Sequence, residues 1–294
     1  MNIGEKFNIL CDNLTVQKKT RITISARYQL ITQRLNTDFW SIDSKISNSL
    51  YVGSYGRGTA VRGFSDLDII FKMPLHLYIR YHNYTHNGQS ALLQAVKNSL
   101  QKTYHSTHLR GDGQVVSIRF KDGIEFEILP AFENTDSSFR YPDSNNGGKW
   151  KLTNPISEIR TIKYNNESTN YNLINLCRMT RAWRDKWDVP IGGLLIDTLA
   201  NQFLMQWKYK YKSYFYYGFM ARDFFLYLSD QIPQQLYWKA LGSGQNVYRK
   251  GRFENKAKQC YNLAVQAIEC ESKKYDFTAN SKWREIYGSA YPNQ

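Results

Sequence analysis

Long hydrophobic segments are missing from this 294-residue sequence. No run of about 18 apolar residues occurs that could form a transmembrane helix, and the first ten residues lack the apolar stretch of a secretory signal. We therefore expect a soluble, cytoplasmic protein that does not contact a membrane.

Cysteine is also scarce. The four cysteines, Cys11, Cys177, Cys260 and Cys270, form neither a C-x-x-C pair nor a Cys/His cluster with the spacing of zinc ligands. A disulfide framework and a structural zinc site are therefore not predicted. The Walker A pattern ending in G-K-[ST] is absent as well, which disfavours a P-loop ATPase.

Acidic residues are fewer than basic ones. The sequence has 39 Lys and Arg against 25 Asp and Glu, which gives a formal net charge of +14 at pH 7. Such a field attracts anions, so nucleic acid, nucleoside triphosphates and acidic membrane surfaces are the partner classes that fit. Hydrophobic residues make up 42% and charged residues 22%, which is typical of a globular protein long enough for two lobes.

The pattern of apolar residues divides the chain into a mixed α/β front half and a helical back half. A long helix is expected at 14–36, where apolar residues from Ile24 to Leu35 recur at steps of three and four. The front half should also hold strands at 49–54, 66–72, 115–120 and 124–129 and a helix at 89–103. Residues 137–149 are rich in Ser, Asn, Gly and Pro and predict a loop, followed by helices at 168–187, 191–212, 219–230 and 252–273.

Two carboxylates lie close together in the strand expected at 66–72. Side chains alternate between the faces of a strand, so Asp66 and Asp68 point the same way while Leu67 and Ile69 point into a core. Neighbouring carboxylates repel each other unless a cation lies between them. A hard divalent ion such as Mg²⁺ is the natural partner of these oxygen ligands.

A glycine-rich loop precedes that strand, with four glycines from Gly53 to Gly63. In its Gly53-Ser54 turn the missing Cβ lets backbone N–H groups approach an anion, and the Ser54 hydroxyl adds a donor. The turn therefore suits the β- and γ-phosphates of a nucleotide, with Arg57 as a further contact.

A later strand supplies a third carboxylate. In the segment 124–129, Glu125 and Glu127 share one face, and apolar residues occupy the other. A third ligand would complete a two-metal site, in which one ion activates the attacking hydroxyl and the other holds the triphosphate. Periodicity alone leaves Glu125 and Glu127 as alternatives.

Three segments in this order resemble the motifs of the DNA polymerase β-like nucleotidyltransferase superfamily: G-S-Y-G-R-G-T at 53–59, D-L-D-I-I-F at 66–71 and F-E-I-L-P-A-F at 126–132. They are most similar to those of the bacterial cGAS/DncV-like nucleotidyltransferases (CD-NTases, SMODS-type) of CBASS antiphage systems. The resemblance implies a bilobed α+β fold. A mixed-sheet catalytic lobe at 1–149 and a helical lobe at 150–294, which completes the nucleotide pocket, would be linked by a long N-terminal helix.

The same resemblance selects one of the two glutamates. Family members carry an acidic residue three positions before the proline of the P-A-F segment, here Pro130, which points to Glu127. It implies that Asp66, Asp68 and Glu127 are the catalytic residues and hold two Mg²⁺ ions, with Mn²⁺ as the alternative metal. Most relatives have Asp at this third position, so the longer Glu127 implies a different ion spacing or ligand geometry.

The helical lobe carries a further part of the resemblance. Residues 176–183, L-C-R-M-T-R-A-W, resemble the family's helix whose basic residue binds the incoming triphosphate. This implies nucleotide-binding roles for Arg178 and Arg181, with Arg181 where Lys is usual; Arg can bind phosphate with two parallel hydrogen bonds. A solvated cationic helix face is the alternative interpretation.

Two features of better-known relatives are missing. Gly192 and Gly193 stand where oligoadenylate synthetases have a base-stacking Tyr, so stacking would come from other rings; the candidates are Tyr164, Tyr214 and Tyr216. The Cys-rich zinc insertion with which animal cGAS binds DNA has no counterpart, so activation by double-stranded DNA is not expected.

The sequence thus predicts a template-independent enzyme that joins nucleoside triphosphates into a cyclic di- or trinucleotide, which then activates a CBASS effector. One alternative is a primer- or RNA-extending nucleotidyltransferase, since poly(A) and CCA-adding enzymes share these motifs. The other is a nucleic-acid-binding relative without catalysis, which the intact acidic residues disfavour.

Overall fold

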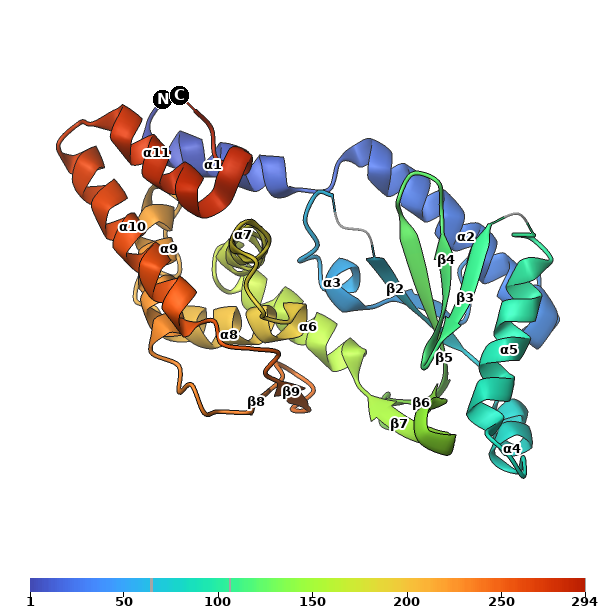
Figure 1. Cartoon of the computed structure of the whole chain (residues 1–294). Coiled ribbons are helices and arrows are strands. Elements are labelled where there is room, and N and C mark those ends of the chain that lie inside the picture. Colours follow the sequence, from blue (N-terminus) through green and yellow to red (C-terminus); the bar gives the residue numbers. More distant parts are fainter. Residues whose placement is uncertain (64–65, 106, 294) are drawn as a thin grey trace. The chain divides into compact units, whose positions relative to one another are not determined.

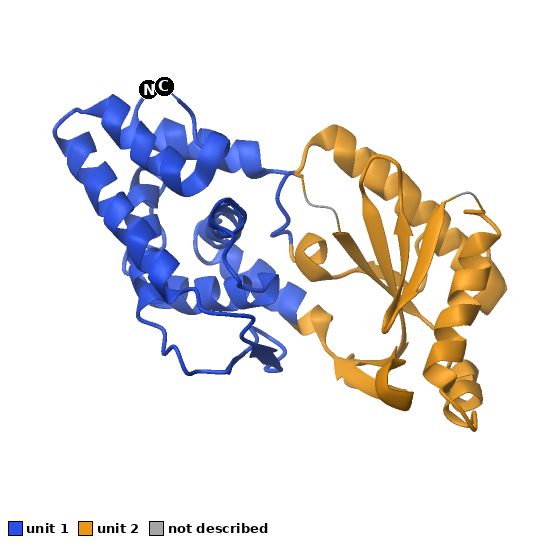
Figure 2. Ribbon diagram, viewed as in Figure 1, with its two compact units in different colours: residues 1–15, 58–62, 158–294 blue, residues 16–57, 63–157 orange. Residues whose placement is uncertain are grey.

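The computed structural model describes residues 1–63, 66–105 and 107–293. The chain folds into two compact units, coloured separately in Figure 2. Unit 1 contains Met1–Thr15, Gly58–Arg62 and Glu158–Gln294, and unit 2 contains Val16–Arg57 and Gly63–Ser157. The sequence predicted a single boundary near residue 149. In the structure, the first 15 residues and the short segment after the glycine-rich loop belong to the helical unit.

Unit 2 is built on a mixed β-sheet (Figure 1). Its strands are β1 (Ser49–Tyr51), β2 (Asp66–Lys72), β3 (His108–Asp112), β4 (Val115–Arg119), β5 (Glu125–Glu133), β6 (Phe139–Asp143) and β7 (Lys149–Thr153). The main order is β1-β2-β5-β4-β3, with β6 paired to β5 and β7 to β6. β2 and β5 run parallel, and the other pairs are antiparallel. The two strands that carry the predicted carboxylates are therefore direct neighbours.

Helices cover one face of this sheet. The helices of unit 2 are α2 (Lys18–Trp40), α3 (Gly53–Gly56), α4 (Leu75–His82) and α5 (Gly88–Gln101). Leu67 and Ile69 of β2 and Phe126 and Ile128 of β5 point to the covered face and are fully buried, in one core with Ile31 of α2. A shift of one residue would turn every such side chain to the opposite face, so this core fixes the strand register.

The long helix predicted at 14–36 is α2, which begins and ends four residues later than predicted, and the shorter helix before it was not predicted. α1 (Ile3–Leu14) belongs to unit 1, and α2 begins at Lys18 in unit 2. Thr15 and Gln17 both have extended backbones, which ends the first helix and caps the second. Thr15 and Val16 are β-branched and form helix weakly, which helps to explain the break.

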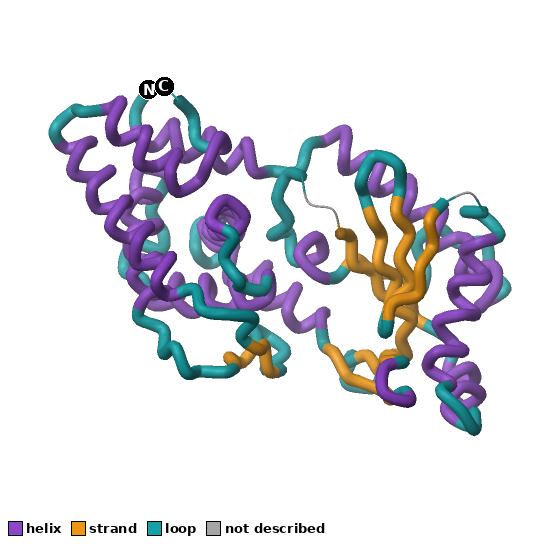
Figure 3. Tube along the Cα trace, viewed as in Figure 1, coloured by secondary structure: helices purple, strands orange, loops and turns teal. Residues whose placement is uncertain are grey.

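Unit 1 is mostly helical, as Figure 3 shows. Besides α1 it holds α7 (Asn172–Trp187), α8 (Gly193–Gln206), α9 (Tyr217–Ser229), α10 (Glu254–Ser272), α11 (Asp276–Tyr287) and a hairpin of β8 (Tyr237–Lys239) and β9 (Asn246–Tyr248). α6 (Pro155–Glu167) begins in unit 2 and continues into unit 1. The four predicted back-half helices correspond to α7–α10, whereas α6 and α11 were not predicted.

The segment 137–149, which was predicted to be a loop, contains strands. Residues 137–149 contain β6, a short 3-10 helix at Asn145–Gly147 and the first residue of β7. The prediction of a loop was wrong because Phe139 and Asp143 are buried despite their polar, Gly-rich surroundings. Among the described residues, no helix combines the length and apolar character needed to cross a bilayer.

Candidate active site

The Gly-Ser turn forms one helical turn, α3, that is bonded to the strand carrying the acidic pair. The N–H of Gly56 donates to the carbonyl of Val52 at 2.9 Å, and the N–H of Arg57 donates to that of Gly53 at 3.1 Å. The Val52 N–H in turn donates to the carbonyl of Asp68 at 2.9 Å. The predicted phosphate loop and the predicted metal ligand are thus joined through the backbone.

Gly53 is required at this place for two reasons. Its φ of +58° lies in the left-handed region that favours glycine. A Cβ built on it would lie 2.5 Å from Cγ of Asp68 and closer still to Oδ2. The carboxylate of Asp68 therefore rests against the bare backbone of the turn, which no other residue type permits without movement.

The strand register places the acidic residues in two rows on the face away from α2 and α5, where the α3 turn lies against Asp68. Asp66 lies opposite Glu125, and Asp68 lies opposite Glu127. Side chains at these alternating positions point away from the buried Phe126. The Glu127 predicted from the family motif is therefore the direct neighbour of Asp68.

Burial and like charge raise the pKa values of Asp68 and Glu127. Desolvation raises the pKa of Asp68, Arg57 lowers it, and Asp66 raises it. Desolvation also raises the pKa of Glu127 to about 7, and the charges of Asp68, Asp66 and Glu125 raise it further. The site holds more negative charge than its own residues neutralise, which is the condition that a bound cation relieves.

The chemistry of this donor set fits a hard divalent cation. All the groups are carboxylates, the oxygen ligands that Mg²⁺ and Mn²⁺ prefer. Over the described ranges, no three Asp, Glu, His or Cys side chains converge tightly enough to form a complete metal site. Metal binding by these carboxylates is therefore a proposal.

The other loop residues predicted to bind nucleotide lie in the same part of unit 2. Ser54 is half-buried in α3, directly after Gly53. Arg57 caps α3 and is only 7% exposed, and its charge lowers the pKa of Asp68. The structure therefore brings Gly53, Ser54, Arg57 and Asp68 together.

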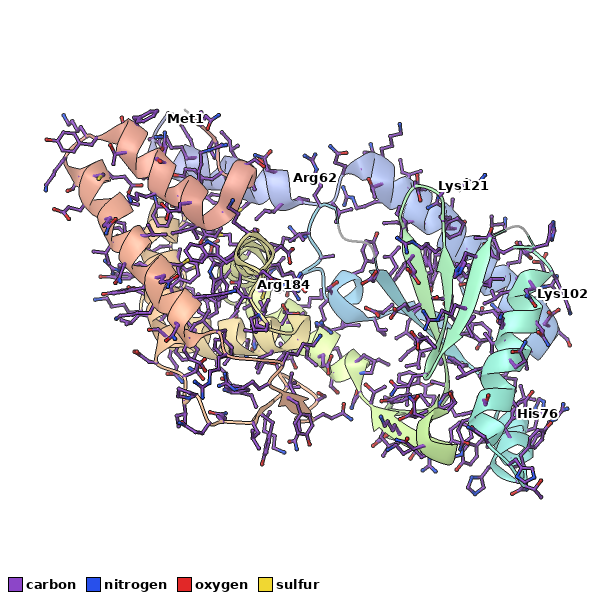
Figure 4. All side chains as sticks on the ribbon, in the orientation of Figure 1. Met1, Arg62, His76, Lys102, Lys121 and Arg184 are labelled. Carbon is purple, nitrogen blue, oxygen red and sulfur yellow. The ribbon has the colours of Figure 1, made fainter. Side chains whose placement is uncertain are left out.

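Arg178 and Arg181 lie on α7 in unit 1, the helix whose C-terminal Arg184 is labelled in Figure 4. Arg178 donates from Nη2 to the carbonyl of Gly58 at 2.9 Å and from Nη1 to Thr15 Oγ1 at 3.1 Å. Arg181 is 3% exposed and forms an ion pair with Asp197. Because both of its terminal nitrogens are engaged inside the protein, the geometry does not support direct triphosphate binding by Arg181.

The sequence analysis did not identify two residues of the hydrogen-bond network around Arg181, namely Thr59 and Asp197. Thr59 Oγ1 donates to Asp197 Oδ2 at 3.0 Å, and both side chains are fully buried. A signal was present, because Asp197 is an isolated acid within the apolar run 194–200, and a buried carboxylate requires partners.

The aromatic residues suggested for base stacking are spread over unit 1. Tyr164 on α6 is 71% exposed. The ring of Tyr214 lies 4.7 Å from that of Tyr217, and the ring of Tyr216 lies 5.2 Å from that of Tyr209. These contacts do not favour one of the three rings. The base-stacking residue therefore stays a prediction among Tyr164, Tyr214 and Tyr216.

A mixed sheet with a Gly-Ser turn packed against a D-x-D strand, next to a parallel strand that carries a further carboxylate, defines a polymerase β-like nucleotidyltransferase. The family model described as "Second Messenger Oligonucleotide or Dinucleotide Synthetase domain" (SMODS) matches residues 1–166. The chain belongs to this family, which confirms the predicted enzyme class. A search of curated proteins found no match.

Solved structures support the fold over nearly the whole chain. Vibrio cholerae DncV cyclic AMP-GMP synthase, in complex with a linear intermediate, has a TM-score of 0.74 at 13% identity, covering 99% of this chain and 97% of that one. Escherichia coli MS115-1 CdnC with ATP has a TM-score of 0.71 at 15% identity, covering 99% of both. Bradyrhizobium diazoefficiens CD-NTase CdnG with GTP has a TM-score of 0.69 at 9% identity, covering 98% and 95%. At these identities the likeness shows the fold, and it confirms the predicted bilobed α+β architecture.

Proposed function

We propose that this protein joins nucleoside triphosphates, without a template, into a cyclic di- or trinucleotide that activates an effector in antiphage defence. The observation that carries this is the parallel register of β2 and β5, which sets Asp68 beside Glu127, together with the contact of Asp68 against Gly53. Membership of the SMODS family supports an oligonucleotide or dinucleotide product. The solved relatives with ATP, GTP or a linear pppApG intermediate support nucleotide substrates.

In this mechanism the acidic residues hold two Mg²⁺ ions. Asp66, Asp68 and Glu127 are the residues that would hold these ions, and the attacking group is a ribose hydroxyl. When bound, the ions lower the pKa of that hydroxyl and offset the charge of the triphosphate. Glu127 accepts the proton of the hydroxyl, the new P–O bond forms at the α-phosphorus, and pyrophosphate leaves. The Gly53-Ser54 turn and Arg57 hold the phosphates.

The test is incubation of the protein with a mixture of the four common NTPs and Mg²⁺, followed by phosphatase treatment and mass spectrometry. We expect a phosphatase-resistant cyclic product from the native protein and none from Asp68→Asn. Recovery of only dephosphorylated, unjoined nucleosides would refute the proposal. Elongation of an added RNA oligonucleotide would instead support a primer-extending enzyme. Salt-sensitive RNA binding without turnover would support a binding protein.

A further inference from the structure

The connection between α8 and α9 and the first turns of α9 are rich in aromatic and basic residues. Eight of the 17 residues from Trp207 to Asp223 are aromatic, four are Lys or Arg, and one is acidic. At 207–212 aromatic residues and lysines alternate, in the order W-K-Y-K-Y-K. The segment joins the two helices through a short 3-10 helix at Tyr214–Tyr216 (Figure 1). All of it belongs to unit 1.

Four rings of this region form a continuous row, which we call the aromatic ladder. The ring centroids of Trp207 and Tyr209 lie 5.6 Å apart, and those of Tyr209 and Tyr216 lie 5.2 Å apart. The ring of Phe219 follows at 6.0 Å from that of Tyr216. Trp207 is buried and anchors one end, because its Nε1 donates to Asp223 Oδ2 at 2.9 Å. Phe219 at the other end is 37% exposed.

A cation lies over each of the three rings that follow Trp207 in the ladder. Lys208 Nζ is 4.6 Å from the centroid of the Tyr209 ring, and Lys212 Nζ is 5.5 Å from that of Tyr216. Arg222 Cζ is 5.2 Å from the centroid of the last ring. A cation within about 6 Å of a ring centroid is attracted to the face of the ring. Positive charge therefore accompanies the rings along the ladder.

Two asparagines hold the backbone of the Lys-Tyr repeat from inside the protein. Asn172 Nδ2 donates to the carbonyl of Lys210 at 2.9 Å and to that of Lys212 at 2.8 Å. Asn170 Nδ2 donates to the carbonyl of Tyr211 at 3.2 Å. Asn170 has a φ of +52°, a sparsely populated conformation that persists only where its surroundings fix it. The repeat is thus ordered before any ligand binds, which lowers the entropy lost on binding.

This combination of groups fits single-stranded nucleic acid. Proteins that bind single strands use a basic surface along the phosphates together with aromatic rings on which the bases stack. Besides Phe219, the rings of Tyr211 and Phe215 are exposed, by 64% and 55%. The one acid, Asp223, pairs with Arg222 at 2.7 Å, so the charge of the lysines is left for phosphates.

The same composition disfavours two other partners. A double helix keeps its bases stacked on one another, so it offers none to exposed rings. Residues 207–217 contain no Leu, Ile or Val, and most of their rings are tyrosines with a polar hydroxyl, which disfavours insertion into a bilayer.

We infer that unit 1 carries a binding site for single-stranded nucleic acid, formed by the aromatic ladder, the exposed rings of Tyr211 and Phe215, and the lysines of the repeat. The bases stack on the exposed rings, and the phosphates contact Lys208, Lys210 and Lys212. Binding at this site needs no chemistry at the acidic residues of unit 2, so the inference does not rest on the proposed function.

The test is fluorescence anisotropy with labelled oligouridine of about 12 nucleotides, a length within the range that one such surface covers, and with oligothymidine of the same length. EDTA is present and NTPs are left out, so the result does not depend on whether the protein forms a product. We expect both strands to bind more tightly than a DNA duplex of equal length. The logarithm of the affinity should fall linearly with the logarithm of the salt concentration, with a slope of about −2 for three lysine contacts.

Two substitutions separate the contribution of charge from that of stacking. Lys208→Gln should make the salt slope shallower by about 0.7, the change expected for one phosphate contact with a single strand. Phe219→Ala should weaken binding about tenfold at every salt concentration, because one base loses its stacking partner. Phe219→Trp, which restores a ring, should bind about as tightly as the native protein.

Matched controls lie elsewhere in unit 1. Lys258 Nζ is also 4.6 Å from the centroid of a tyrosine ring, that of Tyr261 on α10, so Lys258→Gln removes the same charge and the same kind of contact outside the ladder. Phe277 on α11 is 84% exposed, so Phe277→Ala removes an exposed ring. Neither control should change the affinity or the salt slope.

The inference is overturned if the native protein binds neither strand, if the duplex binds as tightly as the single strands, or if Lys258→Gln changes the slope as much as Lys208→Gln. Tighter binding to phosphatidylserine vesicles than to oligouridine, lost in Phe219→Ala, would assign the ladder to a membrane surface and overturn it as well. If Phe219→Ala fails to fold, Tyr211→Ala takes its place in the comparison with Phe277→Ala.

Discussion

Gly53→Ala adds a single methyl group where the Gly-Ser turn meets Asp68. The new Cβ would lie 2.5 Å from Asp68 Cγ and closer still to Oδ2, whereas ordinary contacts begin near 3.4 Å, so the carboxyl must retreat by at least 0.9 Å. Misplacement of a catalytic group by about 1 Å can cost about 100-fold in rate. Because φ at this position is +58°, a residue with a Cβ also lowers the free energy of unfolding by about 1–2 kcal/mol. Product formation at saturating Mg²⁺ and NTP should therefore fall about 100-fold, measured by chromatography of the phosphatase-resistant product.

The control for backbone strain is Gly147→Ala. Gly147 has a φ of +86°, and a Cβ there meets nothing within 4 Å. It should lose a similar amount of stability, read from the unfolding midpoint, and keep its activity. If Gly53→Ala retains native activity, or if Gly147→Ala loses as much, the contact between the turn and Asp68 does not position the carboxylate, and the reasoning fails.

Other changes to the acidic residues should give distinct results. Asp68→Asn should abolish product yet raise the melting temperature of the metal-free protein at pH 8, because a repelling charge is removed; a lower melting temperature would contradict this. Glu127→Gln should lose activity at least 100-fold, as expected for a lost metal ligand, whereas Glu125→Gln should stay within a few-fold of native; the reverse order in a product assay would assign the third ligand to Glu125. Mg²⁺ competes with the proton on Glu127, whose pKa is about 7, so the apparent Mg²⁺ affinity should weaken about tenfold per pH unit below 7 and level off above it, as read by calorimetric titration. The raised pKa also means that the metal-free protein loses stability as the pH rises from about 4.5 to 7, because the unfolded chain releases the Glu127 proton over that range while the folded state still holds it; a melting temperature that does not change with pH over that range would argue against it.

Local alternation was enough to predict the acidic pair. Leu67 and Ile69 are fully buried, so the strand period that places them in a core necessarily places Asp66 and Asp68 on the other face. Alternation could not decide whether Glu125 or Glu127 is the third metal ligand, because both residues share a face. The pairing of β2 with β5 is a contact between distant segments, and only the structure shows Asp68 opposite Glu127.

The α7 arginines show why a motif match does not fix a role. Arg181 was expected to bind phosphate because a basic residue recurs at that position in relatives. Its buried partner Asp197 lies on α8, and the partner of Asp197, Thr59, is far away in the chain. Such a network depends on three segments meeting in unit 1, which no local pattern encodes. α1 was not predicted, because only the apolar stripe of the following helix, α2, was considered.

The division of unit 1 among three stretches of chain has a consequence for biosynthesis. Phe7 of α1 packs against Trp283 and Tyr291, with ring centroids 5.1 and 5.4 Å apart. During synthesis the apolar residues of α1 therefore stay exposed until residues 283–291 have left the ribosome, although domains usually fold in order of synthesis. The same holds for Thr59, whose acceptor Asp197 is translated long after the phosphate loop. A truncated product that ends at residue 166, the limit of the SMODS match, would carry the acidic residues without the partners of Phe7 and Thr59, so premature termination should yield an aggregation-prone chain and no active fragment.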